Sequence, residues 1–139
     1  MTASELLAWQ IDDVGNQILK TLEDLPAEHR DARVVPGAMS PNDVIEHLCE
    51  CYEAAAAVAE GRKHPWGRFA FSGETWEERL ARWRELRSRA KALVTGGDDP
   101  KRLTEGYEYI VGHDAYHVGQ LCQLRLHLDP KWDSMSIYG

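Results

Sequence analysis

Hydrophobic residues recur every three or four positions along four stretches of the chain, and no stretch alternates apolar and polar residues as a half-buried strand does. This repeat predicts four amphipathic helices. Before the first stripe, Thr2 and Glu5 have the spacing of a capping box, and Pro26 after it is expected to stop the helix. The first stripe consists of Leu7, Ile11, Val14, Ile18, Leu22 and Leu25.

The second helix has the clearest start in the chain. Ser40 can cap it, Pro41 suits its first position, and Asp43 is favourable near the positive end of the helix dipole. We expect it to run to about Glu60 and to end at Gly61. Its alanine run at 54–57 allows a neighbouring helix to approach closely.

The third and fourth helices follow from similar signals. Thr75 and Glu78 form another capping box, and the third helix should end at Gly96-Gly97. The fourth should begin between Asp99 and Thr104 and end at Asp129-Pro130. The third stripe is Trp76, Leu80, Trp83, Leu86 and Ala90, and the fourth is Leu103, Tyr107, Ile110, His117, Leu121, Leu124 and Leu128.

Four amphipathic helices of about 20 residues bury their stripes together as a bundle. We therefore predict an all-α, four-helix-bundle fold, with residues 1–139 as a single domain, a size at which a core needs no disulfide or metal staple. Arginines of the third helix alternate with acids and alanines and are expected to form a solvated face. They are Arg79, Arg82, Arg84, Arg87 and Arg89.

Charge and composition exclude several classes of protein. Sixteen basic against 23 acidic residues give a net charge of −7, which argues against nucleic-acid binding. No apolar run reaches the roughly 18 residues of a membrane span, and the first residues lack the pattern of a signal peptide. Three cysteines in a chain with its own core do not suggest a disulfide framework. We expect a cytoplasmic protein.

Residues 61–73 combine glycines and a proline with Trp66, Phe69 and Phe71, and are expected to form a loop. Two roles are open for its rings. They can anchor the loop on the core, or they can form a lid over a pocket. In the second case the basic residues of the loop, Arg62, Lys63 and Arg68, would attract an anion.

Histidines carry the candidate chemistry. His113 and His117 are four apart on the last helix, so both project from one face, and neighbouring apolar positions turn that face toward the core. His47, in the first two turns of the second helix, also faces inward and can supply a third nitrogen. This pattern is compatible with a divalent-metal site and equally with core histidines that are hydrogen-bonded to their neighbours. The poorer candidates are His29, His64 and His127, in loops or near a helix end.

Residues beside these histidines add alternatives. Gln120, one turn after His117, can bond a bound water or satisfy the backbone. Cys51 can approach His47 and soften the site, although packing is the simpler role for a buried thiol. Asp114 stands where a zinc protease carries glutamate, but its side chain is too short for that mechanism. Of Tyr109 and Tyr116, only one can point toward the histidines, and neither is assigned a catalytic role.

The segment from His113 to Leu121, His-Asp-Ala-Tyr-His-Val-Gly-Gln-Leu, preceded by Ser40 to Leu48, Ser-Pro-Asn-Asp-Val-Ile-Glu-His-Leu, resembles the DinB-like, or YfiT-like, superfamily. The resemblance implies an up-up-down-down bundle, frequent homodimers, and a divalent metal, commonly zinc or nickel. It implies His47, His113 and His117 as the metal ligands. Imidazole nitrogen also suits iron and copper, so the metal is open.

The leading hypothesis is a metal-dependent enzyme with a small-molecule substrate. Three neutral imidazoles leave the ion open positions where it can activate water or a thiol. Family members include transferases and isomerases that use low-molecular-weight thiols, and a hydrolase is the variant without a thiol. The alternatives are a non-enzymatic metal-binding or stress-response protein, and a helical dimer with purely structural histidines.

Overall fold

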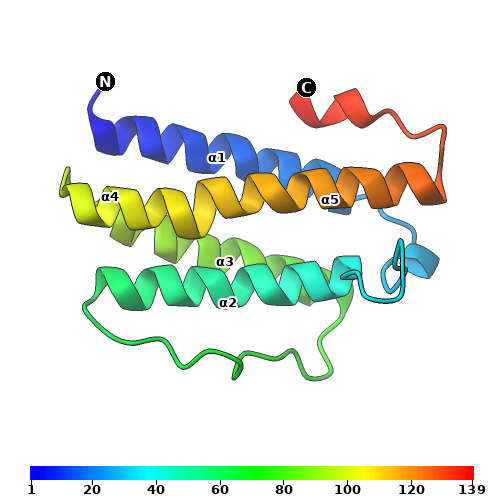
Figure 1. Cartoon of the computed structure of the whole chain (residues 1–139), viewed down its shortest axis with the longest axis horizontal. Helices are drawn as coiled ribbons and strands as arrows, with labels where there is room; N and C mark the ends of the chain where they lie inside the picture. The colour runs from blue at the N-terminus through cyan, green and yellow to red at the C-terminus, as the bar shows by residue number, and fades with distance from the viewer.

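A computed structural model describes all 139 residues and contains helices and no strands. Four helical rods lie side by side (Figure 1). The α-helices are α1 (Ala3–Leu22), α2 (Pro41–Ala59), α3 (Trp76–Val94), α4 (Pro100–Gly106) and α5 (Gly112–Leu128). Short 3-10 turns, η1 (Ala27–His29) and η3 (Ser134–Tyr138), flank the bundle. The predicted all-α bundle is confirmed.

The fourth rod is made of three consecutive pieces. Between α4 and α5 lies η2 (Tyr107–Val111), one turn of π-helix that the hydrophobic pattern did not predict. This wider turn changes the helical register, so Tyr107, expected on the buried stripe, is half exposed, and Gly106 is buried instead. A Cβ at Gly106 would lie 2.9 Å from side-chain atoms of Leu7 and Val94, so the absence of a side chain permits this approach.

The rods do not run in the expected up-up-down-down order. In Figure 1, α1 and α5 run in one direction, while α2 and α3 run in the other, so the order along the chain is up-down-down-up. The connection at 60–75 explains the difference. It travels the length of α2, about 28 Å for 19 residues, so α3 starts again at the end where α2 began.

Most of the predicted helix starts are confirmed at the level of hydrogen bonds. Thr2 and Glu5 form a reciprocal capping box, and so do Ser40 and Asp43, with Pro41 in the first turn. Thr75 also accepts from the backbone N–H of Glu78, at 3.1 Å, although no return bond from that glutamate is formed. The caps therefore fix where each of these helices begins.

The predicted stripes form the core. All six positions of the first stripe are buried, and they join residues of every other rod in one cluster of 21 buried side chains. Within this bundle α2 packs chiefly on α3, and α1 chiefly on α5. The alanines 54–57 of α2 are fully buried, as close helix approach requires. No helix is both long enough and apolar enough to cross a bilayer.

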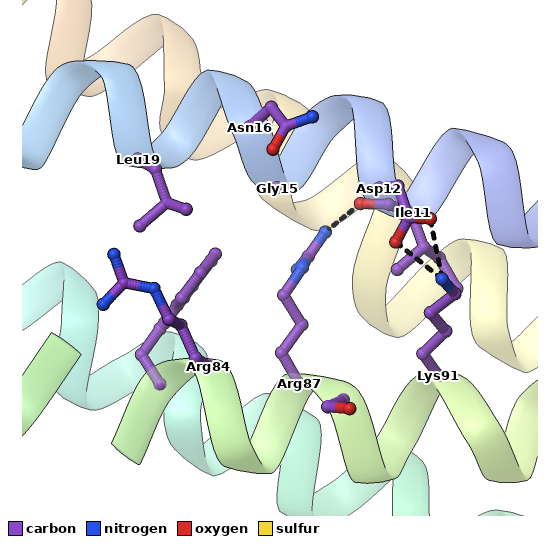
Figure 2. A pocket seen from close by; sticks show the side chains of 10 residues that line it. Ile11, Asp12, Gly15, Asn16, Leu19, Arg84, Arg87 and Lys91 are labelled. Atoms are coloured by element: carbon purple, nitrogen blue, oxygen red, sulfur yellow. Dashed lines mark hydrogen bonds and ion pairs between the residues drawn. The ribbon is translucent and has the colours of Figure 1, made fainter. Parts of the chain in front are cut away.

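One arginine contradicts the prediction of a solvated face on α3. Arg87 is only 7% exposed, because it occupies the inward position between Trp83 and Ala90. Its guanidinium crosses to α1 and donates to the carbonyl oxygen of Ile11, beside Gly15, as Figure 2 shows. Gly15 makes room for it, since a Cβ there would lie 2.6 Å from the guanidinium Nε. A cavity of about 400 Å³ adjoins this crossing.

Besides its bond to α1, Arg87 joins Tyr52 and Asp114 in a buried polar network between three rods. Its Nη1 donates to the Tyr52 hydroxyl of α2, at 2.8 Å, and to the Asp114 carboxylate of α5. The Tyr52 hydroxyl donates to the same carboxylate, at 2.9 Å. Burial raises the pKa of Asp114 to about 6, and the guanidinium of Arg87 opposes that rise. At neutral pH the carboxyl is therefore ionised, and the network contains a buried ion pair.

The loop between α2 and α3 is anchored on α2 by carboxylates. Glu46 accepts from the backbone N–H of Phe71 at 3.0 Å, and Glu50 accepts from that of Gly67 at 2.6 Å. Phe69 and Phe71 pack on the core, as the first of the two expected roles requires. Trp66 is instead 54% exposed and stacks on Tyr109 of the π-turn, with ring centroids 6.4 Å apart.

Candidate metal centre

Three histidines from two rods converge in the structure. The Nε2 atom of His113 lies 3.0 Å from Nε2 of His47 and 3.1 Å from Nε2 of His117. The candidate ligand atoms of all three rings lie within 4.8 Å of one another. Nitrogens bound at about 2.0–2.1 Å to a common ion are roughly 2.8–3.4 Å apart for bond angles between 90° and tetrahedral, and the two separations from His113 are in this range. The cluster could therefore hold a metal ion.

The helices explain why these rings meet. On α2, His47 follows buried Val44 by three residues and precedes buried Cys51 by four, so it lies at the edge of the inner face. On α5, His117 is buried and His113 half-buried one turn before it. The three rings pack edge to face, with centroids 4.6–5.2 Å apart.

The protons available in the cluster do not satisfy these contacts. Nδ1 of His117 lies 2.8 Å from the amide oxygen of Gln120, so it carries a proton and donates it, and Nε2 of His117 is left with a lone pair. If Nε2 of His113 donates to His117 it cannot accept from His47, and if it accepts from His47 it faces the lone pair of His117, so one of the two contacts is always without its own proton. Nδ1 of His113 is buried without a partner. A cation between the Nε2 atoms removes the conflict, because each nitrogen then offers it a lone pair.

The histidines are neutral at physiological pH and therefore competent to bind metal. Burial lowers the pKa of His117 to about 4, and the neighbouring imidazoles lower it further. Burial also lowers the pKa values of His113 and His47, in the first case with help from the adjacent imidazole of His47. An imidazole must be deprotonated to ligate, so the three nitrogens are prepared for a divalent ion.

Gln120, which the sequence placed beside the site, contacts a histidine ring rather than the backbone. Its amide oxygen accepts from Nδ1 of His117, and its amide nitrogen donates to the hydroxyl of Tyr116 at 3.0 Å. These contacts orient the His117 ring and select the tautomer that presents Nε2 to the cluster. The two roles left open by the sequence were a bond to a bound water and one to the backbone, whereas the partners of the Gln120 amide in the structure are both side chains.

Other residues considered from the sequence have different places. Asp114 is fully buried in the network with Arg87, which agrees with its exclusion as a protease-like base. The sulfur of Cys51 lies 3.8 Å from Nε2 of His47, but burial raises its thiol pKa to about 12. Tyr116 is 62% exposed and packs edge to face on His117. His127 is exposed, as predicted.

Carboxylates beside His47 were not recognised from the sequence. A cavity of about 300 Å³ opens on this histidine and is lined by Met39, Asp43, His47, Glu46 and Glu50. The signal was present, because residues 43, 46, 47 and 50 share one face of a helix. The larger cavity beside Arg87 contains none of the three histidines.

A four-helix bundle with three converging imidazoles defines a class of candidate metalloproteins. Comparison with family models identifies the family: the model described as the DinB superfamily matches residues 10–121. The chain belongs to this superfamily, which confirms the resemblance drawn from its motifs. No curated protein and no solved structure matches it.

Replacing Gln120 by leucine should weaken metal binding without unfolding the protein. We expect an affinity loss of about 10–100-fold, the range typical for removal of a residue that orients a metal-bound histidine. Gln120 is exposed, so the fold should tolerate the change. Competition titration against a chelator measures the affinity. Gln123→Leu, exposed on the same helix, is the control, and equal affinities of the two variants would contradict this role.

Proposed function

We propose that the protein is a metal-dependent enzyme that acts on a small molecule, with His47, His113 and His117 holding one divalent ion. The observation that carries the proposal is the convergence of three Nε2 atoms whose contacts cannot all be satisfied by the protons available. Three neutral ligands leave the ion its full charge and open coordination positions, which is typical of catalytic rather than structural sites.

The chain supplies the surroundings that such a site needs. Gln120 orients His117, burial keeps the imidazoles neutral, and the cavity beside His47 gives a small molecule access. When bound, a divalent ion supplies Lewis-acid activation of water in a hydrolase or of a thiol in a transferase. We favour zinc or nickel, with iron as a further candidate, since imidazole suits all three.

The test is a turnover screen of metal-loaded protein against esters and amides, and against electrophiles with a low-molecular-weight thiol. Consumption without thiol identifies a hydrolase, and consumption that needs the thiol identifies a transferase. In both cases the rate should disappear with a chelator and return with metal. Stoichiometric metal binding without turnover in either arm would instead support a non-enzymatic metal-binding protein.

Acid should release the metal. The lowered pKa values mean that protons do not compete with the ion near pH 7, and that they begin to compete only below the ordinary imidazole value of about 6.5. We expect constant metal content from pH 8 to 7 and loss between about pH 6 and pH 4. Dialysis at each pH followed by metal analysis measures this. Full retention at pH 4 would argue against coordination by imidazoles alone.

The same shifts predict how the metal-free fold responds to pH. His47, His113 and His117 each have a folded-state pKa below the unfolded value, so below about pH 6.5 these three groups bind more protons in the unfolded chain than in the folded one. Their contribution to the free energy of unfolding therefore decreases as the pH falls from 6.5 toward 4.

A further inference from the structure

A second cavity lies beside the candidate metal centre, and its walls are mostly apolar. Its volume is about 390 Å³, within the range of small-molecule sites. It lies between α5 and the segment that leads into α2. The residues that matter here are Val34, Met39, Tyr116, Gly119, Gln120 and Leu124.

This apolar cavity adjoins the proposed site. Gln120 and Tyr116 form part of its wall, and they are the residues hydrogen-bonded in series to the ring of His117. Met39 lines both this cavity and the one that opens on His47. Met39 is therefore the point at which the two cavities adjoin, and a molecule that lies over its side chain would extend from one toward the other.

Gly119 keeps the apolar cavity open. A Cβ at this position would have no heavy atom within 4 Å, so it would project into free space. Glycine within a helix is destabilising by about 1 kcal/mol relative to alanine, and packing does not account for it at this position. Val34 and Tyr116 are 42% and 62% exposed, which leaves apolar surface without a partner at the rim.

We propose that this cavity binds the apolar part, an alkyl chain or a ring, of a small-molecule substrate whose polar end reaches the metal. The inference rests on the proposed function and adds a substrate class to it. The cavity at the metal side is lined by the carboxylates of Asp43, Glu46 and Glu50. Repulsion by these groups disfavours a polar end with several negative charges.

The experiment uses Co²⁺-loaded protein and two alkyl hydroxamates, acetohydroxamate and hexanohydroxamate, which share a metal-binding head and differ in chain length. The absorption spectrum of the cobalt reports binding. Gly119→Leu fills the cavity, and Gly119→Ala is the matched control, since it removes the glycine but leaves the space. Neither change meets another atom at the Cβ position, so both variants should fold.

In the wild type and in Gly119→Ala we expect hexanohydroxamate to bind at least about tenfold more tightly than acetohydroxamate, since each fully buried methylene contributes roughly fourfold. In Gly119→Leu the ratio should fall below about threefold, while the affinity for acetohydroxamate stays the same. An equal ratio in all three proteins would overturn the proposal.

A second measurement keeps the inference separate from the metal site. In metal-free protein labelled with ¹³C at the methionine methyls, 1-hexanol should shift the signal of Met39 but not those of Met1 and Met135, which are 88% and 67% exposed. If cobalt does not bind, the proposed function fails, and the Met39 signal still decides whether the cavity takes an apolar ligand.

An unchanged Met39 signal at saturating alcohol would exclude such a ligand. Sedimentation of the wild type and of Gly119→Leu tests the other candidate occupant, a second copy of the chain. Dissociation of a dimer by the leucine would overturn the proposal, because the cavity would then be part of an interface. Identical sedimentation of the two proteins supports it.

Discussion

Arg87→Met is expected to lower the free energy of unfolding by about 3–5 kcal/mol, the range for breaking a buried charge pair by removing one partner. The substitution leaves the Asp114 carboxylate fully buried without its guanidinium, and also deprives Tyr52 of a donor. It removes the bond to the carbonyl of Ile11 as well, so the link from α3 to α1 is lost. Urea denaturation followed by circular dichroism measures the change.

Arg84→Met is the matched control on the same helix. Arg84 pairs with Glu23 at 2.9 Å, but both side chains are about half exposed, so the loss should stay below about 1 kcal/mol. The double variant Arg87→Met with Asp114→Asn should lose less than the sum of its two single variants, because it removes both charges. If the losses of unfolding free energy in the two single variants added up to that of the double variant, Arg87 and Asp114 would not stabilise each other, contrary to the proposed network.

His113→Ala should remove the metal while leaving the helices intact. Nε2 of His113 is the atom within 3.1 Å of both other rings, so its loss leaves two imidazoles on separate rods with no common neighbour. We expect about one equivalent of divalent metal per wild-type chain purified without a histidine tag, and less than about a tenth in the variant. Mass spectrometry of the metals, with circular dichroism for folding, gives the answer.

His127→Ala controls for the general loss of a histidine. It lies on the same helix, is exposed, and is absent from the cluster, so its metal content should equal that of the wild type. The three-histidine centre would be contradicted if the wild type contained no metal, or if His113→Ala kept it. The three residues would then be core histidines with a purely structural role.

Arg87 and Gln120 show where reasoning from the sequence stopped short. Arg87 falls on the inward stripe, four residues after Trp83 and three before Ala90, but an arginine among other charged residues is ordinarily solvated. Its burial depends on Asp114, 27 residues further along the chain. Gln120 was recognised as a neighbour of His117, but its partner atom depends on rotamers and on the hydroxyl of Tyr116.

By itself, the sequence determined the four helices, their caps, most of their buried stripes, and the pairing of His113 with His117 on one helix face, because each of these depends on residues within one or two turns of one another. Only the tertiary structure decided the directions of the rods, the approach of His47 to His113, the π-turn, the buried ion pair, and the two cavities beside His47 and Gln120. These features depend on contacts between residues far apart in the chain, and the spacing of residues along one helix does not contain that information.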